Sequence, residues 1–361
     1  MLDRRLTNGK LKKFILGIII LTFLIGFIYN TAAPRKYVES TSDFGSVEGW
    51  EYNTSRDASL YLDNSSSILK PKHFCESVVF LRVVVSSAPV NLQNRVAIRE
   101  TWGSQHNISG MSIKVYFLLG DSTNASVQAD IIKENEIYND IVQERFIDSY
   151  NNLTLKSIAM LKTFSTFCMQ TTTFLMKTDD DMYLNMRPLI SMLNSTNTTN
   201  VMVGSLICGA KPIKDINNKW YTPSYMYRDR IYPNYLSGTG YVMSIDVVPK
   251  LYEAALITPI FHLEDIYITG MLSRVIHVRP RNNGGFTFQK RKFDPCVFKT
   301  AFTSHRLSPS EIHDQYLLLE TLDLAMECKL QEEMAARSLN NLLGIFTMTK
   351  SKPKKKKIVC F

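Results

Sequence analysis

Three consecutive carboxylates, Asp179, Asp180 and Asp181, follow a short apolar run from Phe174 to Met176. Such a run is typical of a buried strand in an α/β sheet, because strands of this kind are covered on both faces. Ligands of open α/β sheets bind beyond the carboxyl ends of the strands. If the chain stays extended, Asp179 and Asp181 point to one side while Asp180 points away. The pattern predicts two carboxylate ligands for a divalent ion that a bound phosphate shares.

Two other interpretations of this acidic stretch can be weighed. A solvated acidic turn is common after a strand, but three adjacent like charges repel one another unless a cation offsets them. An EF-hand loop requires a glycine where Leu184 stands and a bidentate glutamate where Ile190 stands, so this interpretation fails. The acidic turn therefore remains as the alternative to a metal site.

A second acidic pair, Glu264 and Asp265, lies between apolar residues. Apolar surroundings are unfavourable for carboxylates unless one of them caps a helix or takes part in chemistry. Asp265 fits the N-cap of a helix over residues 266–273. It also fits a catalytic carboxylate, and the pattern alone leaves both roles open.

Two arginines near the first strand suit a diphosphate ligand. Arg95 and Arg99 share one face of a helix expected over residues 91–103. Paired guanidinium groups beside a sheet crevice bind diphosphates well. The same spacing is found in surface arginines that pair with Glu100 or other acids, so the second role stays open.

Two glycines, Gly238 and Gly240, follow an aromatic-rich stretch over residues 220–235. The aromatic stretch has no clear period and is expected to be a loop that lines a pocket. Glycines at alternate positions let a ligand approach the backbone closely, or they mark a bulge in a strand. The sequence predicts a ligand contact here and leaves the bulge as the alternative.

An alternating series of strands and helices positions these residues. The expected strands are residues 78–85, 114–120, 142–146 and 174–176, and the expected helices between them are residues 91–103, 127–141 and 153–170. This β-α-β-α-β-α-β order predicts a mostly parallel sheet flanked by helices. Strands at 201–204 and 241–244 and helices at 245–256 and 308–342 are expected farther along the chain.

The chain has 361 residues, 45% of them hydrophobic, enough for one large core or two smaller ones. Its net charge of +9 comes from the two tails, because five basic residues precede Phe14 and six lysines lie between Lys350 and Lys357. The middle of the chain is close to neutral. This distribution disfavours a nucleic-acid-binding face.

Residues 14–29 form an uncharged apolar run, and the basic residues before it predict that residues 1–13 stay in the cytosol. A helix of this length spans roughly 24 Å, which suits the thin membranes of the early secretory pathway. We expect an uncleaved signal-anchor, with a signal peptide cleaved near residues 31–33 as the alternative. Either way the rest of the chain enters the lumen, where N-glycosylation sequons can be used at Asn53, Asn64, Asn107, Asn124, Asn152, Asn194 and Asn197.

The lumenal part is expected to begin with a stem over residues 30–75, which is polar and lacks a sustained period. A catalytic domain over residues 76–325 follows, and residues 326–361 complete a helix and form a basic tail. Six cysteines without CxxC spacing argue against zinc and allow scattered disulfides or buried thiols. Cys168, at helical spacing behind apolar residues, is expected to be a packed thiol.

Six blocks of the chain resemble, in order and spacing, the β-1,3-galactosyltransferase-like enzymes of glycosyltransferase family 31. They are RVAIRETWG (95–103), FLLG (117–120), DSYNNLTLK (148–156), KTDDD (177–181), YPNYLSGTGYVMS (232–244) and LEDIY (263–267). The resemblance implies a GT-A-like nucleotide-diphospho-sugar transferase fold in a single-pass type II Golgi membrane protein. It also implies inverting transfer from a UDP-sugar to the 3-hydroxyl of a glycan on protein or lipid, dependent on Mn²⁺ or alternatively Mg²⁺.

The resemblance also implies roles for individual residues. Asp181 is similar to the family's direct metal ligand, and Asp179 and Asp180 would serve the ribose or the water shell of the ion. Asp265 is similar to the catalytic base. His305 falls where family members place a late histidine near the metal. One departure is that Ile268-Thr269 stand where the family usually has a single residue, which bears on the acceptor-side pocket.

The expected mechanism is a single displacement that inverts the anomeric centre. Charge develops on the leaving UDP and is stabilised by the metal ion, with Arg95, Arg99 or Lys177 adding to this effect. Asp265 accepts the proton of the attacking hydroxyl. A nucleophilic Glu264 or Asp265 with retention of configuration is the alternative.

Alternatives for the function as a whole also stay open. UDP-galactose and UDP-N-acetylglucosamine both fit these motifs as donor, so a β-1,3-N-acetylglucosaminyltransferase is the first alternative. An inactive lumenal sugar-binding or scaffold protein is the second, although such a protein has no use for a catalytic base.

Overall fold

The computed structural model describes residues 21–22, 45–62 and 66–343, and the described residues from 45 onward belong to one compact unit. The signal-anchor expected over residues 14–29 and the lysine-rich tail lie outside the described residues, residues 21 and 22 excepted. Within the described ranges, no helix has both the length and the apolar character needed to cross a membrane.

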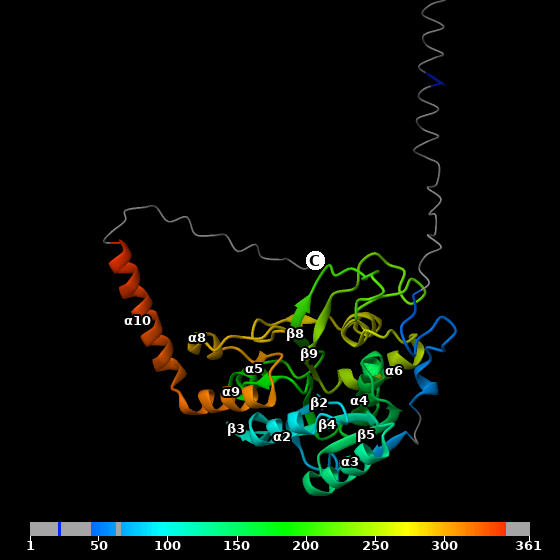
Figure 1. The fold of residues 1–361 in the computed structure, drawn as a ribbon, viewed down its shortest axis with the longest axis horizontal. Coiled ribbons are helices and arrows are strands. Elements are labelled where there is room, and N and C mark those ends of the chain that lie inside the picture. Colours follow the sequence, from blue (N-terminus) through cyan, green and yellow to red (C-terminus); the bar gives the residue numbers. More distant parts are fainter. Residues whose placement is uncertain (1–20, 23–44, 63–65, 344–361) are drawn as a thin grey trace, which may run out of the picture. The chain divides into compact units, whose positions relative to one another are not determined.

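A mixed β-sheet forms the centre of this unit (Figure 1), with strand order β1-β5-β4-β2-β6-β9-β8-β10. Its strands are β1 (Ser67–Leu69), β2 (Val79–Ser86), β4 (Met111–Asp121), β5 (Ile141–Ile147), β6 (Thr172–Asp179), β8 (Met202–Ile207), β9 (Tyr235–Ser244) and β10 (Arg281–Asn282), and β3 (Asn107–Ile108) pairs with β4. Strands β5, β4, β2 and β6 are parallel, whereas β9 runs antiparallel to β6 and β8. The predicted β-α-β-α-β-α-β series is confirmed as the parallel part of the sheet.

Helices cover both faces of the sheet. One face packs against α2 (Leu92–Glu100), α3 (Ala125–Tyr138), α5 (Met186–Asn194) and α9 (Pro309–Thr321), and the other packs against α4 (Leu153–Phe167), α6 (Val247–Ile257) and the π-helix η4 (Ile266–Leu272). Strand β2 shows why both faces are apolar: Val83 and Val85 join one core, while Val84 joins the other. Successive side chains of a strand point to opposite faces, so a continuous apolar run serves two cores.

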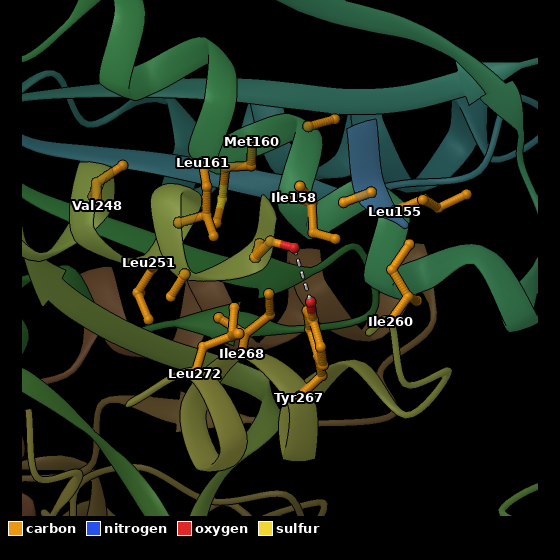
Figure 2. Packing of buried hydrophobic residues seen from close by; sticks show 14 of the residues in the cluster. Leu155, Ile158, Met160, Leu161, Val248, Leu251, Ile260, Tyr267, Ile268 and Leu272 are labelled. Atoms are coloured by element: carbon orange, nitrogen blue, oxygen red, sulfur yellow. Dashed lines mark hydrogen bonds between the residues drawn. The ribbon is translucent and has the colours of Figure 1, made fainter. Parts of the chain in front are cut away.

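The core between α4, α6 and η4 holds the second acidic pair in place (Figure 2). Figure 2 shows side chains of the three helices meeting in one layer, among them Leu161, Leu251 and Leu272, all fully buried. The Tyr267 hydroxyl donates to the carbonyl of Thr258 at 2.7 Å. This packing fixes the helix that carries Glu264 and Asp265.

The N-terminal part of the described chain differs from expectation. Residues 45–62 and 66–75, expected to be part of a stem, are packed onto the same unit as the sheet. Trp50 is only 1% exposed, and Leu62 and Cys75 join the same core as α4 and α6. The sequence did not predict these contacts, because the segment is polar and has no period. A few buried side chains are nevertheless enough to hold it against the core.

The cysteines and the C-terminal helices also correct two expectations. Cys168 forms a disulfide with Cys75 and is not a packed thiol. A second disulfide joins Cys296, in α8 (Pro295–Phe298), to Cys328. The single helix expected over residues 308–342 is two helices, α9 and α10 (Leu324–Leu343), because Asp323 caps the second by accepting from the backbone of Ala325.

Candidate functional site

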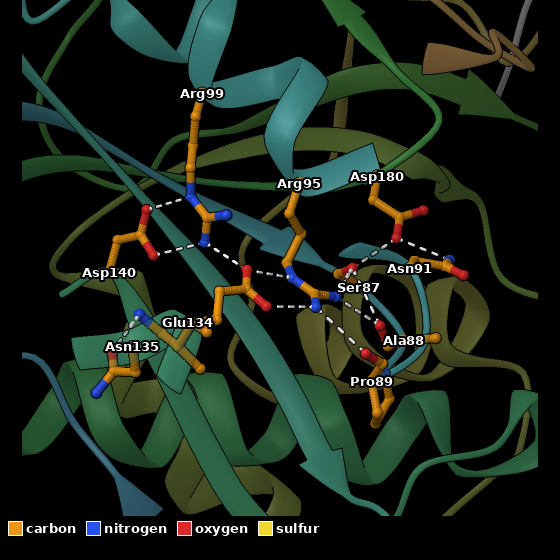
Figure 3. A network of polar contacts seen from close by, with 11 residues as sticks. Ser87, Ala88, Pro89, Asn91, Arg95, Arg99, Glu134, Asn135, Asp140 and Asp180 are labelled. Atoms are coloured by element: carbon orange, nitrogen blue, oxygen red, sulfur yellow. Dashed lines mark hydrogen bonds and ion pairs between the residues drawn. The ribbon is translucent and has the colours of Figure 1, made fainter. Parts of the chain in front are cut away.

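The three carboxylates at the end of β6 separate as their alternation predicted. The Asp180 carboxylate is buried and accepts hydrogen bonds from Ser87 Oγ at 2.6 Å and Asn91 Nδ2 at 2.9 Å (Figure 3). Burial raises the pKa of Asp180, and these hydrogen bonds partly oppose that effect. Asp180 thus holds the loop between β2 and α2, while Asp179 and Asp181 face elsewhere.

Asp179, Asp181 and His305 form a cluster that can hold a metal ion. One ligand atom from each lies within 4.8 Å of the other two, and His305 Nε2 is 3.3 Å from Asp181 Oδ2. Two carboxylates and an imidazole suit Mn²⁺, and carboxylates also suit Mg²⁺. The residues expected to be metal ligands are therefore brought together.

His305 is far from Asp181 in the sequence and reaches the cluster through strand pairing. The strand β11 (Thr303–Ser304) pairs antiparallel with β7 (Tyr183–Leu184), directly after the acidic motif. The His305 Nδ1 atom lies 2.8 Å from the carbonyl of Phe288, and donation there leaves Nε2 as the nitrogen that faces Asp181 and can ligate a metal. Burial lowers the pKa of His305, but the hydrogen bonds with Asp181 and with the carbonyl of Phe288, together with the charges of Asp181 and Asp179, outweigh it and raise the pKa above its ordinary value.

Lys177 connects the two acidic motifs. Its ammonium donates to Asp179 Oδ1 and to the carbonyl of Gly238, both at 2.6 Å, and lies 3.7 Å from Glu264 Oε2. Burial alone would lower the pKa of Lys177, but the charges of Asp179 and Glu264 outweigh it, so the pKa is raised. A permanently charged ammonium therefore stands between the metal cluster and the second acidic pair.

Glu264 and Asp265 have different surroundings. Glu264 is buried, and its Oε1 accepts from Ser157 Oγ at 2.7 Å and from the Tyr241 hydroxyl at 2.8 Å. Asp265 is partly exposed, and burial together with the charge of Glu264 raises the pKa of Asp265 to about 7. This difference favours Asp265 as the carboxylate that exchanges a proton.

The N-cap interpretation of Asp265 agrees poorly with its geometry. Its backbone is helical, with φ −64° and ψ −41°, whereas an N-cap residue is typically extended. Its carboxylate accepts from the adjacent N–H of Ile266 at 2.9 Å, not from an N–H two or three residues farther on. Asp265 lies inside the first turn of a helix that begins at Glu264.

The extra residue noted in the sequence lies in a π-helical turn, η4. A π-helix accommodates one additional residue inside a helix and is frequent at functional sites. The hydroxyl of Thr269 donates to the carbonyl of Asp265 at 2.6 Å and accepts from the N–H of Leu236 at 2.8 Å. The added residue leaves both carboxylates in place and ties their helix to β9.

Gly238 and Gly240, expected to contact a ligand, have neighbours in the protein itself. A Cβ atom at Gly238 would lie 2.9 Å from Glu264 Oε2, so this position requires glycine for the close approach of the acidic helix. A Cβ atom at Gly240 would make ordinary contact with Met176 at 3.5 Å. Both glycines lie within β9, and the structure gives Gly238 a packing role.

Arg95 and Arg99 are not presented as diphosphate ligands (Figure 3). The Arg95 guanidinium is 1% exposed and forms a two-pronged ion pair with Glu134 at 2.7 and 2.8 Å. Arg99 pairs with Glu134 at 2.7 Å and with Asp140 at 2.8 Å. The prediction that the two arginines contact a diphosphate is therefore wrong. Both guanidinium groups pair instead with acids of the protein, Glu134 on α3 and Asp140 directly before β5. Arg95 also donates to Ser87 Oγ at 3.1 Å, which links it to Asp180.

Removing one partner from this network is expected to destabilise the fold. Glu134→Ala leaves the buried Arg95 guanidinium without its carboxylate partner and removes one of the two acids that pair with Arg99, which costs about 3–5 kcal/mol in the free energy of unfolding. Denaturant unfolding of the variant measures the loss. Glu136→Ala, an exposed acid on the same helix, is the control and should unfold like the parent. Equal stability of the two variants would contradict this assignment.

Trp220 and Tyr150 form an aromatic pair to which the sequence assigned no role. Trp220 Nε1 donates to the Tyr150 hydroxyl at 3.0 Å, and the two residues are 44% and 47% exposed. Burial raises the pKa of Tyr150, the hydrogen bond with Trp220 lowers it, and the charges of Asp265 and Asp179 raise it. The Tyr150 hydroxyl is therefore influenced by the charges of both carboxylates. The signal in the sequence was its position in an aromatic-rich stretch and in the block over residues 148–156.

Comparison with known proteins shows the family to which this chain belongs. A family model described as galactosyltransferase matches residues 93–284, which include both acidic motifs. β-1,3-Galactosyltransferase 1 of Homo sapiens and of Mus musculus are each 37% identical over 249 residues, covering 68% of this chain and 76% of the relative. β-1,3-Galactosyltransferase 2 of Homo sapiens is 32% identical over 283 residues, covering 74% of this chain and 67% of the relative. The chain therefore belongs to the galactosyltransferase family, resembles its β-1,3-galactosyltransferases, and is a hexosyltransferase.

Proposed function

We propose that this protein transfers galactose from UDP-galactose to the 3-hydroxyl of a glycan acceptor, with inversion at the anomeric carbon. The observation that carries the proposal is the arrangement of the Asp179–Asp181–His305 cluster and Asp265 on either side of Lys177. One group of residues can hold a metal and diphosphate while the other handles a proton. The names of the relatives support galactose as the donor sugar, and the mixed sheet with helices on both faces supports a GT-A-like nucleotide-sugar fold.

Asp179, Asp181 and His305 are the residues that would hold Mn²⁺ or Mg²⁺. The fit rests on the donor set, since two carboxylates and an imidazole lone pair converge within 4.8 Å. When bound, the ion acts as a Lewis acid that stabilises negative charge on the leaving diphosphate. The Lys177 ammonium adds a fixed positive charge next to Asp179.

Asp265 is the general base in this proposal. The acceptor oxygen attacks the anomeric carbon, its proton passes to a carboxylate oxygen of Asp265, and the bond to the diphosphate breaks with its electron pair leaving on UDP. Glu264 is less suited to this step or to nucleophilic attack, because it is buried and bound by Ser157 and Tyr241. A single displacement with inversion follows from this assignment.

The proposal includes a lumenal location behind a type II Golgi membrane anchor. The apolar run over residues 14–29 and its basic flank support the anchor. The disulfides support an oxidising compartment. Several asparagines of the sequons are exposed, as glycan attachment requires: Asn53, Asn107, Asn124, Asn194 and Asn197.

A donor screen with the full-length chain in detergent tests the proposed function. We expect UDP release from UDP-galactose in the presence of a glycan acceptor and Mn²⁺, and its loss when EDTA removes the metal. NMR of the product is expected to show a β-1,3-linked galactose. Preference for UDP-N-acetylglucosamine would support the alternative transferase. Donor binding without any turnover would support a sugar-binding or scaffold protein.

A further inference from the structure

We infer that residues 45–62, here called the N-terminal strap, position the acceptor side of the proposed active site. The inference rests on the proposed function, because it assigns the face beside Asp265 to the acceptor. The strap lies outside the six sequence blocks and contains none of the candidate ligands. Its contacts, however, go to the segment that carries Tyr150, to the loop that carries Trp220 and to the residues that lead into the helix of Asp265.

The strap is docked by buried side chains rather than by surface polar contacts alone. Trp50 and Ala58 are each 1% exposed, and Leu62 is 3% exposed. The Trp50 ring lies 5.5 Å from the ring of Tyr61 in a tilted arrangement, centroid to centroid. Burying a tryptophan gives the strap a strong hydrophobic anchor. The strap is therefore fixed on the core, and it can in turn fix the segments to which it is hydrogen-bonded.

The first segment that the strap contacts carries Tyr150. Trp50 Nε1 donates to the carbonyl of Asn151 at 2.9 Å. In return, Asn151 Nδ2 donates to the carbonyl of Glu48 at 3.2 Å. These two hydrogen bonds fix the turn at Asn151, immediately after Tyr150.

The second segment is the aromatic loop that carries Trp220. The Tyr225 hydroxyl donates to the carbonyl of Trp50 at 2.6 Å, and the Tyr221 hydroxyl donates to the carbonyl of Gly45 at 3.2 Å. Tyr221 is the next residue after Trp220. The strap thus bridges the two elements whose side chains meet in the Tyr150–Trp220 hydrogen bond.

The third segment leads directly into the acidic helix. Arg56 accepts at its carbonyl from the N–H of Ile260 at 2.8 Å, and its guanidinium lies 3.4 Å from the carbonyls of Ile260 and Met226. Ile260 is fully buried and lies four residues before Glu264. The strap therefore constrains the entry of the chain into the helix that carries Asp265.

In the part of the chain that the structure describes, the strap contacts the segments of Tyr150, Trp220 and Ile260 but not the candidate metal ligands. Among the hydrogen bonds of the described residues, none joins the strap to Asp179, Asp181 or His305. Loosening the strap should therefore displace the Tyr150–Trp220 pair and the acceptor, while the metal cluster and the donor site keep their geometry. A small displacement of a bound reactant can lower the rate by a factor of about 10².

The test compares Trp50→Ala and Trp50→Phe with the parent in the full-length chain. For Trp50→Ala we expect the KM for the glycan acceptor to rise about tenfold or more. The kcat/KM for the acceptor should fall, because a misplaced reactant reacts more slowly. Donor hydrolysis by water, without acceptor, and the KM for UDP-galactose should stay near the parent values. Trp50→Phe keeps an aromatic anchor and loses the bond to Asn151, so its effect should be smaller.

Controls separate positioning from general loss of stability. Ile131→Ala removes a buried side chain from α3 that belongs to a different core from that of Trp50, and it should lower Tm without raising the acceptor KM. If Trp50→Ala does not fold, Tyr225→Phe removes only a hydroxyl that bonds the strap and provides the same test.

Three outcomes are decisive. An acceptor KM in the Trp50 and Tyr225 variants equal to that of an active parent overturns the inference and leaves the proposed function intact. An equal rise in Ile131→Ala also overturns it, because stability alone would explain the effect. A parent without any transfer activity refutes the proposed function itself, which the donor-hydrolysis and transfer assays on the parent reveal first.

Discussion

Replacing Asp181 with alanine is expected to reduce galactosyl transfer by about 10³-fold or more, because metal ions stabilise transition-state charge by several kcal/mol. The fold should survive, since Asp181 follows a strand end and its side chain is partly exposed. Transfer rates, calorimetric titration of UDP with Mn²⁺, and Tm are the measurements. Both the rate and the metal-dependent affinity for UDP should fall, while Tm stays near that of the parent.

A matched control for Asp181 is Asp130→Ala, which removes an exposed carboxylate from α3, remote from the metal cluster. It should behave like the parent in all three measurements. Near-normal transfer by Asp181→Ala would remove the central assignment of the site and favour the solvated acidic turn.

Asp265→Asn is expected to lower kcat by about 10²–10⁴-fold, the usual contribution of a positioned proton acceptor. Asparagine keeps the size of the side chain and most of its hydrogen bonds, so binding of UDP-galactose with Mn²⁺ should change little. Steady-state kinetics and donor titration distinguish this result from that of Asp181→Ala, which should impair both rate and binding.

The pH profile provides a second measurement of the same role. A general base must be ionised, and the pKa of Asp265 is raised to about 7. We therefore expect kcat/KM to fall about tenfold for each pH unit below that value, and this slope to disappear in Asp265→Asn. Turnover of Asp265→Asn within about threefold of the parent would contradict proton transfer by Asp265 and leave a capping role, which asparagine fills well.

Glu264→Gln serves as the comparison for Asp265→Asn. Glu264 is buried, and its carboxylate is bound by Ser157 and Tyr241 and faces Lys177. Removing its charge should lower Tm, because a buried ammonium loses one of its two nearby acids. A large loss of kcat with unchanged stability would instead make Glu264 the base.

Local patterns were enough to predict the central part of the fold. The strand–helix alternation through the end of β6 follows from apolar runs and helical periods, which depend on burial of neighbouring residues. The opposed directions of Asp180 and its two neighbours follow from the period of an extended chain. These features were predictable because each is settled by residues close together in the sequence.

The partners of the two arginines were not predictable in the same way. Spacing placed Arg95 and Arg99 on one helical face, but it does not say whether a guanidinium meets a diphosphate or a carboxylate. Glu134 lies 39 residues beyond Arg95 and reaches it only through the packing of α3. A charged side chain at a sheet edge has the same local signature in both cases, so only the folded arrangement distinguishes them.

The sequence by itself determined the parallel strand series, the acidic motif at the end of β6 and the second acidic pair before η4. The tertiary structure decided which side chains complete the site. It brought His305 beside Asp181 through the pairing of β11 with β7, and it packed the N-terminal strap against the segments that carry Tyr150 and Trp220. Periodicity records whether a residue is buried, whereas its partner across the fold depends on the path of the whole chain.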